Sequence, residues 1–176
     1  MDARKGSEPT LTKNPTRAER KSERELVVTR TINGPARIVF EAFTKAELFK
    51  RWWVPKSVGL SLLSCEMDVR VGGTYRLVFS HPASSEPMAF FGRYNEVIPH
   101  SRLVWTNDEG GEDGAVTTVT FEERGAQTLV VMYDLYPSKE ALDGAIASGS
   151  TAGGFSETFE QLDELLVTLG ATVGRS

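Results

Sequence analysis

The C-terminal stretch at residues 150–169 reads STAGGFSETFEQLDELLVTL. Large apolar side chains recur in it at steps of three and four residues, the spacing of one face of an α-helix: Phe155, Phe159, Leu162, Leu165, Leu166 and Leu169. The other face of this expected helix is polar and carries Glu157, Glu160, Gln161, Asp163 and Glu164. Because so broad an apolar stripe must cover another apolar surface, we expect a long C-terminal helix packed against the rest of the chain.

The segments before this helix predict mainly β-strands. Runs rich in β-branched and aromatic residues, separated by Gly, Pro, Asn and Asp, indicate strands at residues 26–32, 60–67, 73–80, 88–98, 102–106, 115–123 and 128–135. The last six are joined by short turns and should therefore be antiparallel neighbours. Alternation predicts one strongly apolar face, carrying Tyr75, Leu77, Phe79, Val119, Phe121, Leu129, Val131, Tyr133 and Leu135.

Two short helices are expected between the first and second strands. Pro35 suits the first turn of a helix, and the apolar residues at 38–43 continue it. Thr44 with Glu47 has the spacing of a capping box and predicts a second helix that runs to Trp53. A further short helix, capped by Ser138, should precede the long one. The fold class predicted is α+β, with a curved antiparallel sheet of about seven strands wrapped around the C-terminal helix.

The domain organisation expected from composition is one domain with a terminal arm. Residues 1–25 are charged and poor in apolar surface, which predicts a disordered or loosely attached arm. Residues 26–170 form the expected domain, and residues 171–176 a C-terminal tail. With 13 Lys and Arg against 19 Asp and Glu after residue 25, the folded part carries about −6, which argues against a nucleic-acid partner.

Composition also bears on the compartment. The chain has no apolar run near the ~20 residues needed to span a bilayer, and its first residues lack the apolar core of a signal peptide. We therefore expect a cytoplasmic protein without membrane insertion. Cys65, the single cysteine, fits a reducing compartment and is interpreted as a small core residue rather than a nucleophile.

Sequence fragments resemble a known superfamily. They are PARIVFEAF at 35–43, RWWVP at 51–55, GGTYR at 72–76, GRYNEV at 92–97 followed by RLVW at 102–105, and the segment from 148 through Gly154 to LDELL at 162–166. In this order they resemble the helix-grip proteins of the START and birch-pollen-allergen (SRPBCC) superfamily, and more closely its bacterial branch related to the activator of the heat-shock-protein-90 ATPase. The resemblance spans residues 26–169. Many relatives carry Gly-Trp where this chain has Gly154-Phe155, which changes the edge of the expected cavity.

The resemblance implies a deep cavity between the sheet and the long helix that takes a small hydrophobic molecule without a cofactor. Relatives include lipid carriers, plant-hormone binders and aromatic polyketide cyclases, so the fold does not select one activity. One alternative is a cyclase or hydrolase in which Arg93, Tyr75, Tyr133 or Asp134 polarises a carbonyl or moves a proton. Another is an interaction module that stimulates a chaperone ATPase in a stress response. A homodimer is compatible with either.

Motifs for other chemistries are absent or weak in the sequence. The only histidines, His81 and His100, lie beside prolines in predicted turns, so neither a Ser-His-Asp triad nor a metal site is expected. Gly72-Gly73 lacks a following phosphate-loop lysine and is interpreted as a bulge or tight turn. The acidic stretch at 108–113 lacks calcium-loop spacing and is interpreted as a hairpin tip. No catalytic residue is assigned.

The candidate site is therefore the lining of the expected cavity. Its members are Trp53, Tyr75, Leu77, Phe79, Phe91, Arg93, Trp105, Phe121, Tyr133, Phe155 and Phe159. Simple core packing is the alternative at each aromatic position. Arg93 shares a strand face with Phe91, and a buried guanidinium needs a partner, so we expect it to meet Glu66, Asp134 or an anionic group of the ligand. Trp52-Trp53 could form a structural plug or the lip of the cavity.

Overall fold

The computed structural model describes residues 16–54, 56, 59–83, 85–108, 114–147 and 152–169. Its helices and strands follow one another in the order β2 (Arg17–Arg20), β3 (Glu25–Ile32), α1 (Ala36–Thr44), α2 (Ala46–Phe49), β4 (Ser61–Met67), β5 (Thr74–Ser80), β6 (Met88–Ile98), β7 (Arg102–Thr106), β8 (Val116–Arg124), β9 (Gln127–Leu135), α3 (Lys139–Ala147) and α4 (Ala152–Thr168). None of these helices is long and apolar enough to cross a membrane.

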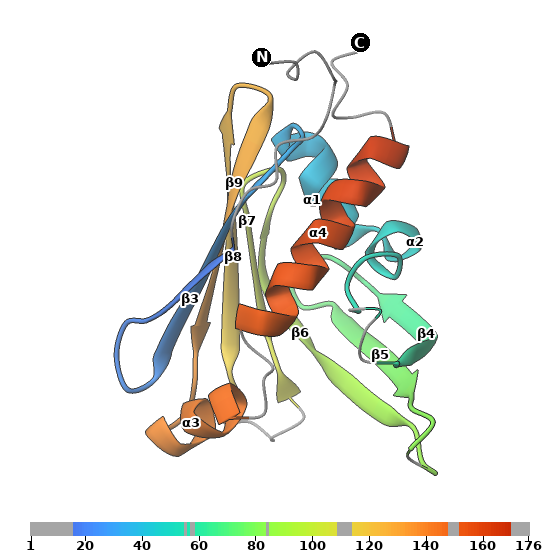
Figure 1. Cartoon of the computed structure of the whole chain (residues 1–176), viewed down its shortest axis with the longest axis vertical. Helices are drawn as coiled ribbons and strands as arrows, with labels where there is room; N and C mark the ends of the chain where they lie inside the picture. The colour runs from blue at the N-terminus through green and yellow to red at the C-terminus, as the bar shows by residue number, and fades with distance from the viewer. Residues whose placement is uncertain are drawn as a thin grey trace, which may run out of the picture.

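The strands form one curved antiparallel sheet. Their order is β2-β3-β9-β8-β7-β6-β5-β4, so β4 to β9 are successive hairpins and β3 joins the meander beside β9. Figure 1 shows α4 crossing one face of the sheet, with α1 and α2 beside it. The predicted α+β architecture, a curved sheet around a long C-terminal helix, is confirmed.

The eighth strand, β2, places residues 17–20 in the sheet, within the segment 1–25 that was predicted to be a disordered or loosely attached arm. Arg17 pairs with Thr29 and Arg20 pairs with Leu26, antiparallel to β3. All four side chains of β2 are exposed. The sequence reasoning missed this strand because it judged order by apolar burial, whereas an edge strand is held by backbone hydrogen bonds to its neighbour. Residues 1–15 and 170–176 lie outside the described residues.

The inner face of β9 differs from the predicted one. Thr128, Val130, Met132 and Asp134 are buried, whereas the alternate set, which includes Tyr133, lies half-buried on the outer face. Both alternating sets of β9 residues contain apolar side chains. The alternation therefore shows which residues share a face, but it does not show which face is buried. The pairing of Met132 with the fully buried Val28 of β3 settles the direction.

Helix α4 buries its apolar stripe and part of its polar face. Phe159, Leu162, Leu165 and Leu166 are buried as expected, and Leu169, just after the helix, is exposed. The buried Asp163 corrects the predicted polar face, since its carboxylate accepts from the Arg30 guanidinium at 2.9 Å and from the Asn33 backbone N–H at 2.8 Å. The helix therefore contacts the sheet with polar as well as apolar side chains.

Two N-caps were predicted from the sequence, and the structure confirms the one before α3 but not the one before α2. Thr44 is the last residue of α1, and its hydroxyl donates to the Phe40 carbonyl at 2.9 Å, so it does not cap α2. Lys45 precedes α2 without a side-chain cap. Before α3, the Ser138 hydroxyl accepts from the Ala141 N–H at 3.0 Å, as expected of an N-cap.

Candidate functional site

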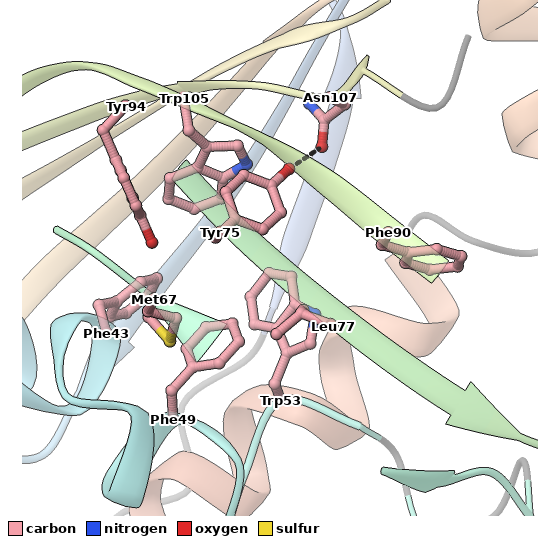
Figure 2. Close-up of a pocket in the computed structure, with 10 residues that line it drawn as sticks. All are labelled: Phe43, Phe49, Trp53, Met67, Tyr75, Leu77, Phe90, Tyr94, Trp105 and Asn107. Carbon is pink, nitrogen blue, oxygen red and sulfur yellow. Dashed lines mark hydrogen bonds between the residues drawn. The ribbon is translucent and has the colours of Figure 1, made fainter. Parts of the chain in front are cut away.

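An apolar pocket opens between the sheet and the α1–α2 region, with about 450 Å³ of empty space including its mouth. Its lining consists of seven aromatic side chains, two aliphatic or thioether side chains and one amide: Phe43, Phe49, Trp53, Met67, Tyr75, Leu77, Phe90, Tyr94, Trp105 and Asn107 (Figure 2). None of these ten residues carries a charge. An apolar, mainly aromatic lining with a few polar groups is typical of small-molecule sites.

The sheet side of the pocket is assembled by strand register. Leu77 of β5 is paired with Phe90 of β6, and Tyr94 of β6 is paired with Trp105 of β7. Directly paired residues project to the same face of a sheet. Phe90 is 42% exposed because it lies at the mouth of the pocket, whereas Tyr94 and Trp105 are buried deeper.

The opposite side is formed by aromatic residues at the end of α2. Phe49 and Trp53 stack with ring centroids 4.7 Å apart, and Trp53 meets Trp105 edge-on at 6.4 Å. Trp52 is fully buried behind this wall, and its indole N–H donates to the Ala42 carbonyl at 2.9 Å. Trp52 is therefore the structural plug and Trp53 is the lip, which resolves the two interpretations of this pair.

The segment after Trp52 is held in place by Gln161 of α4, a residue predicted to lie on the polar face. The Gln161 amide donates to the carbonyls of Trp52 and Val54, each at 2.9 Å. Its carbonyl oxygen accepts from the Lys56 backbone N–H at 2.9 Å. Gln161 is buried, so α4 positions the lip of the pocket through three hydrogen bonds to loop backbone.

A chain of hydrogen bonds leads from the pocket to a buried carboxyl group. The Tyr75 hydroxyl lies 3.3 Å from the Asn107 side-chain oxygen (Figure 2), and the Asn107 amide donates to the Thr117 hydroxyl at 3.1 Å. The Thr117 hydroxyl donates to Asp134 at 2.6 Å. Burial raises the pKa of Asp134 to about 6, although the bond from Thr117 acts in the opposite direction.

The structure brings four of the predicted lining residues together in the pocket: Trp53, Tyr75, Leu77 and Trp105. Phe79, Phe121 and Phe159 are buried core residues outside its lining. The side chain of Phe155 lies outside the described part of the structure. That the four pocket residues bind a ligand stays a prediction.

Three predicted lining residues point away from the pocket. Gly92 and Tyr94 face inward on β6, so Phe91 and Arg93 face outward. Arg93 pairs with Asp108 at 3.3 Å with its side chain 54% exposed, rather than with Glu66, Asp134 or a ligand. Tyr133 lies on the outer face of β9, where its hydroxyl donates to Glu25. The alternation correctly predicted which residues share a face of each strand, but the face that was predicted to be inner is the outer one.

Six lining residues were absent from the prediction: Phe43, Phe49, Met67, Phe90, Tyr94 and Asn107. One signal could have found two of them. Phe90, Gly92 and Tyr94 alternate on β6, and an inward glycine flanked by aromatic residues leaves space beside a sheet. Phe43 and Phe49 carried no comparable signal, because helical apolar residues most often pack into the core.

The titratable side chains near the pocket give no arrangement for nucleophilic catalysis. His81 and His100 do not line it, and burial raises the pKa of Cys65, whose thiol contacts Met67 at 3.6 Å. Among the residues that the structure describes, no three His, Cys, Asp or Glu side chains could hold a metal ion. The arrangement is suited to holding an apolar molecule by shape and by a few hydrogen bonds.

The fold defines an α+β protein of the helix-grip class, in which a curved antiparallel sheet packs around a C-terminal helix. The cavity was predicted between the sheet and this helix, but the pocket lies between the sheet and the α1–α2 region, and no described side chain of α4 lines it. The chain belongs to the family described as Activator of Hsp90 ATPase homolog 1-like protein, whose model matches residues 33–167. The match includes most of the sheet, α1, α2 and nearly all of α4. No curated protein matches the sequence.

Solved bacterial structures share the fold along most of the chain. A protein from Rhodobacter sphaeroides is 22% identical with a TM-score of 0.78, covering 88% of this chain and 99% of its own. A protein from Nitrosomonas europaea is 24% identical with a TM-score of 0.76, covering 86% and 99%. An AHSA1-like protein from Aeromonas hydrophila is 16% identical with a TM-score of 0.66, covering 85% and 98%. At these identities the likeness shows the fold alone.

Proposed function

We propose that this protein binds a small hydrophobic molecule noncovalently in the pocket between β4–β7 and the α1–α2 region. The observation that carries the proposal is an open pocket whose ten lining residues include seven aromatic side chains and no charge. Water in such a pocket finds few hydrogen-bond partners, so an apolar ligand that displaces it gains free energy.

Core packing accounts less well for these aromatic residues. Protein interiors are close-packed, with few voids larger than a water molecule. Here aromatic rings from α1, α2, β5, β6 and β7 face a common space that opens to solvent beside Phe90. The backbone of residues 52–56, next to the lip residue Trp53, is fixed by Gln161, which supports a preformed pocket.

Three of the four residues considered for the catalytic alternative do not line the pocket. Arg93 and Tyr133 lie outside the pocket, and Asp134 is separated from it by Thr117 and Asn107. Of that set only Tyr75 lines the pocket, where its hydroxyl already donates to the Thr106 carbonyl at 2.8 Å. Binding without turnover is therefore the better-supported function. Activation of a chaperone ATPase stays an alternative that rests on the family description.

A pair of neighbouring substitutions tests the proposal. Phe90 and Phe91 are 42% and 38% exposed and face opposite sides of the sheet. An arginine at either position can reach water, but only Phe90→Arg places a charge at the mouth of the pocket. The neutral dye N-phenyl-1-naphthylamine should bind the wild type and Phe91→Arg with similar affinity, and Phe90→Arg at least tenfold more weakly. Equal binding by both variants, or no binding by the wild type, would refute the proposal.

A further inference from the structure

Tyr94 places its hydroxyl at the wall of the pocket (Figure 2). Its side chain is 4% exposed, and its hydroxyl makes no hydrogen bond with any residue that the structure describes. Figure 2 shows the hydroxyl directed toward the side of the pocket formed by Phe43 and Met67. Arg30 Nε is the only buried side-chain polar atom without a partner among the described residues, so the Tyr94 hydroxyl reaches the open space of the pocket and is a candidate to bind a ligand.

The position of Tyr94 is fixed by the Gly72-Gly73 turn. The Tyr94 N–H donates to the Gly73 carbonyl at 2.9 Å, and its own carbonyl accepts from the Gly72 N–H at 2.8 Å. A Cβ on Gly73 would lie 2.0 Å from the Asp68 carbonyl oxygen, so the turn requires glycine there. The Tyr94 ring also packs on Tyr75 with centroids 5.7 Å apart. The hydroxyl is therefore held in place before any ligand arrives.

Trp105 adds a second donor on the same wall. It is the cross-strand partner of Tyr94 and is 9% exposed, and its indole N–H has no acceptor among the described residues. An indole N–H can only donate. The other polar groups of the lining are already engaged, since the Asn107 amide donates to Ala115 and Thr117. The Tyr94 hydroxyl can donate or accept, but the Trp105 indole N–H can only donate, so the two groups together favour an acceptor on the ligand.

The charges around Tyr94 disfavour an anionic ligand. The titratable groups that act on its hydroxyl are Cys65 and Asp68, and both raise the pKa of Tyr94, as burial does. The hydroxyl therefore keeps its proton at neutral pH and remains a donor. Because no lysine, arginine or histidine lines the pocket, a carboxylate would lose its hydration without gaining a cation.

We propose that the ligand is an uncharged molecule whose carbonyl or ether oxygen accepts a hydrogen bond from the Tyr94 hydroxyl. This inference rests on the proposed binding function and adds the chemical class of the ligand and the residue that recognises it. The Trp105 indole N–H supplies a further donor for the same class of molecule.

Three naphthalenes of similar shape test the inference by isothermal titration calorimetry. 2-Acetylnaphthalene carries a neutral acceptor, 2-ethylnaphthalene carries none, and 2-naphthoate carries a charge. Tyr94→Phe should weaken binding of 2-acetylnaphthalene about fivefold, the effect of one hydrogen bond, and leave 2-ethylnaphthalene unchanged. The wild type should bind 2-naphthoate at least tenfold more weakly than 2-acetylnaphthalene.

Tyr133→Phe is the matched control, because Tyr133 is a half-buried tyrosine on the outer face and should affect none of the three affinities. If both neutral naphthalenes bind but Tyr94→Phe weakens them equally or not at all, the role of Tyr94 is refuted while the binding function stands. Tight binding of 2-naphthoate would refute the uncharged class. If none of the three compounds binds, the proposed function fails and this inference fails with it.

Discussion

The backbone carbonyl of Trp52 accepts a 2.9 Å hydrogen bond from the side chain of Gln161, which lies 109 positions later in the sequence. The same amide bonds Val54 and Lys56, so one side chain of α4 holds the loop that follows α2. The lip of the pocket and the C-terminal helix are therefore mechanically connected, although the described side chains of α4 do not line the pocket.

Gln161→Leu should lower both stability and ligand affinity. The substitution leaves the Trp52 and Val54 carbonyls without their partner, and we expect the free energy of unfolding in urea to fall by about 2–4 kcal/mol. Affinity for N-phenyl-1-naphthylamine should fall as well, because Trp53 loses its fixed position. Glu164→Gln, on the exposed side of the same helix, should change neither quantity. Wild-type dye affinity in the Gln161→Leu variant would show that α4 does not position the lip of the pocket.

The buried ion pair between Arg30 and Asp163 should be costly to break on one side. The two side chains are 1% and 8% exposed and lie 2.9 Å apart. Asp163→Leu leaves a guanidinium buried without its counter-charge, so we expect a loss of about 3–5 kcal/mol in urea unfolding. The double variant Arg30→Met with Asp163→Leu removes both charges and should recover most of this loss. A double variant no more stable than Asp163→Leu would contradict this account.

Gly92 should not tolerate even a methyl group. A Cβ there would lie 1.8 Å from the Thr106 carbonyl oxygen and 2.9 Å from the Tyr75 ring. Gly92→Ala must therefore separate β6 from β7 at the pocket wall, and we expect it to lower the midpoint of thermal unfolding and weaken dye binding. Gly144→Ala in α3 meets nothing within 4 Å and should instead stabilise the protein by about 0.5–1 kcal/mol. Similar effects of the two substitutions would contradict the geometry.

Asp134 should make the protein less stable as the pH rises. Burial raises its pKa from 3.8 to about 6, so between these values the folded protein holds a proton that the unfolded chain releases. The free energy of unfolding should therefore decline through this window, to a penalty of about 3 kcal/mol at neutral pH.

Asp134→Asn removes this titration and keeps an acceptor for Thr117. The variant should gain stability relative to the wild type between pH 4 and pH 7, as measured by urea unfolding across that range. A stability difference that does not change with pH would show that Asp134 does not titrate in this window.

All strands except β2 were predictable from sequence to within a residue or two, because glycine, proline and asparagine mark their ends. The predicted strands at 88–98 and 102–106 coincide with β6 and β7. Which face of a strand turns inward was less predictable. On β6 an aromatic residue occurs in both alternating sets, Phe90 in one and Phe91 in the other, so the choice depended on pairing with β5 and β7.

The polar contacts of the site could not be predicted. The helical period predicted that Gln161 and Asp163 face solvent. That prediction assumed that the helix packs on one side only. Helix α4 packs on two sides, because Asp163 meets β3 and the following loop while Gln161 meets the loop after α2. Tyr94 was missed for a related reason, since the pocket that it lines is assembled from residues of several other segments.

The short strand β2 has a consequence for how copies of the chain meet in solution. It covers the backbone of β3 from Leu26 to Thr29, an apolar strand that would otherwise offer free N–H and C=O groups to a second molecule. β2 itself is four residues long and exposes Arg17, Glu19 and Arg20. Short charged edges discourage strand-to-strand association between molecules. Deletion of these residues would thus affect solubility at high concentration before it affected the pocket.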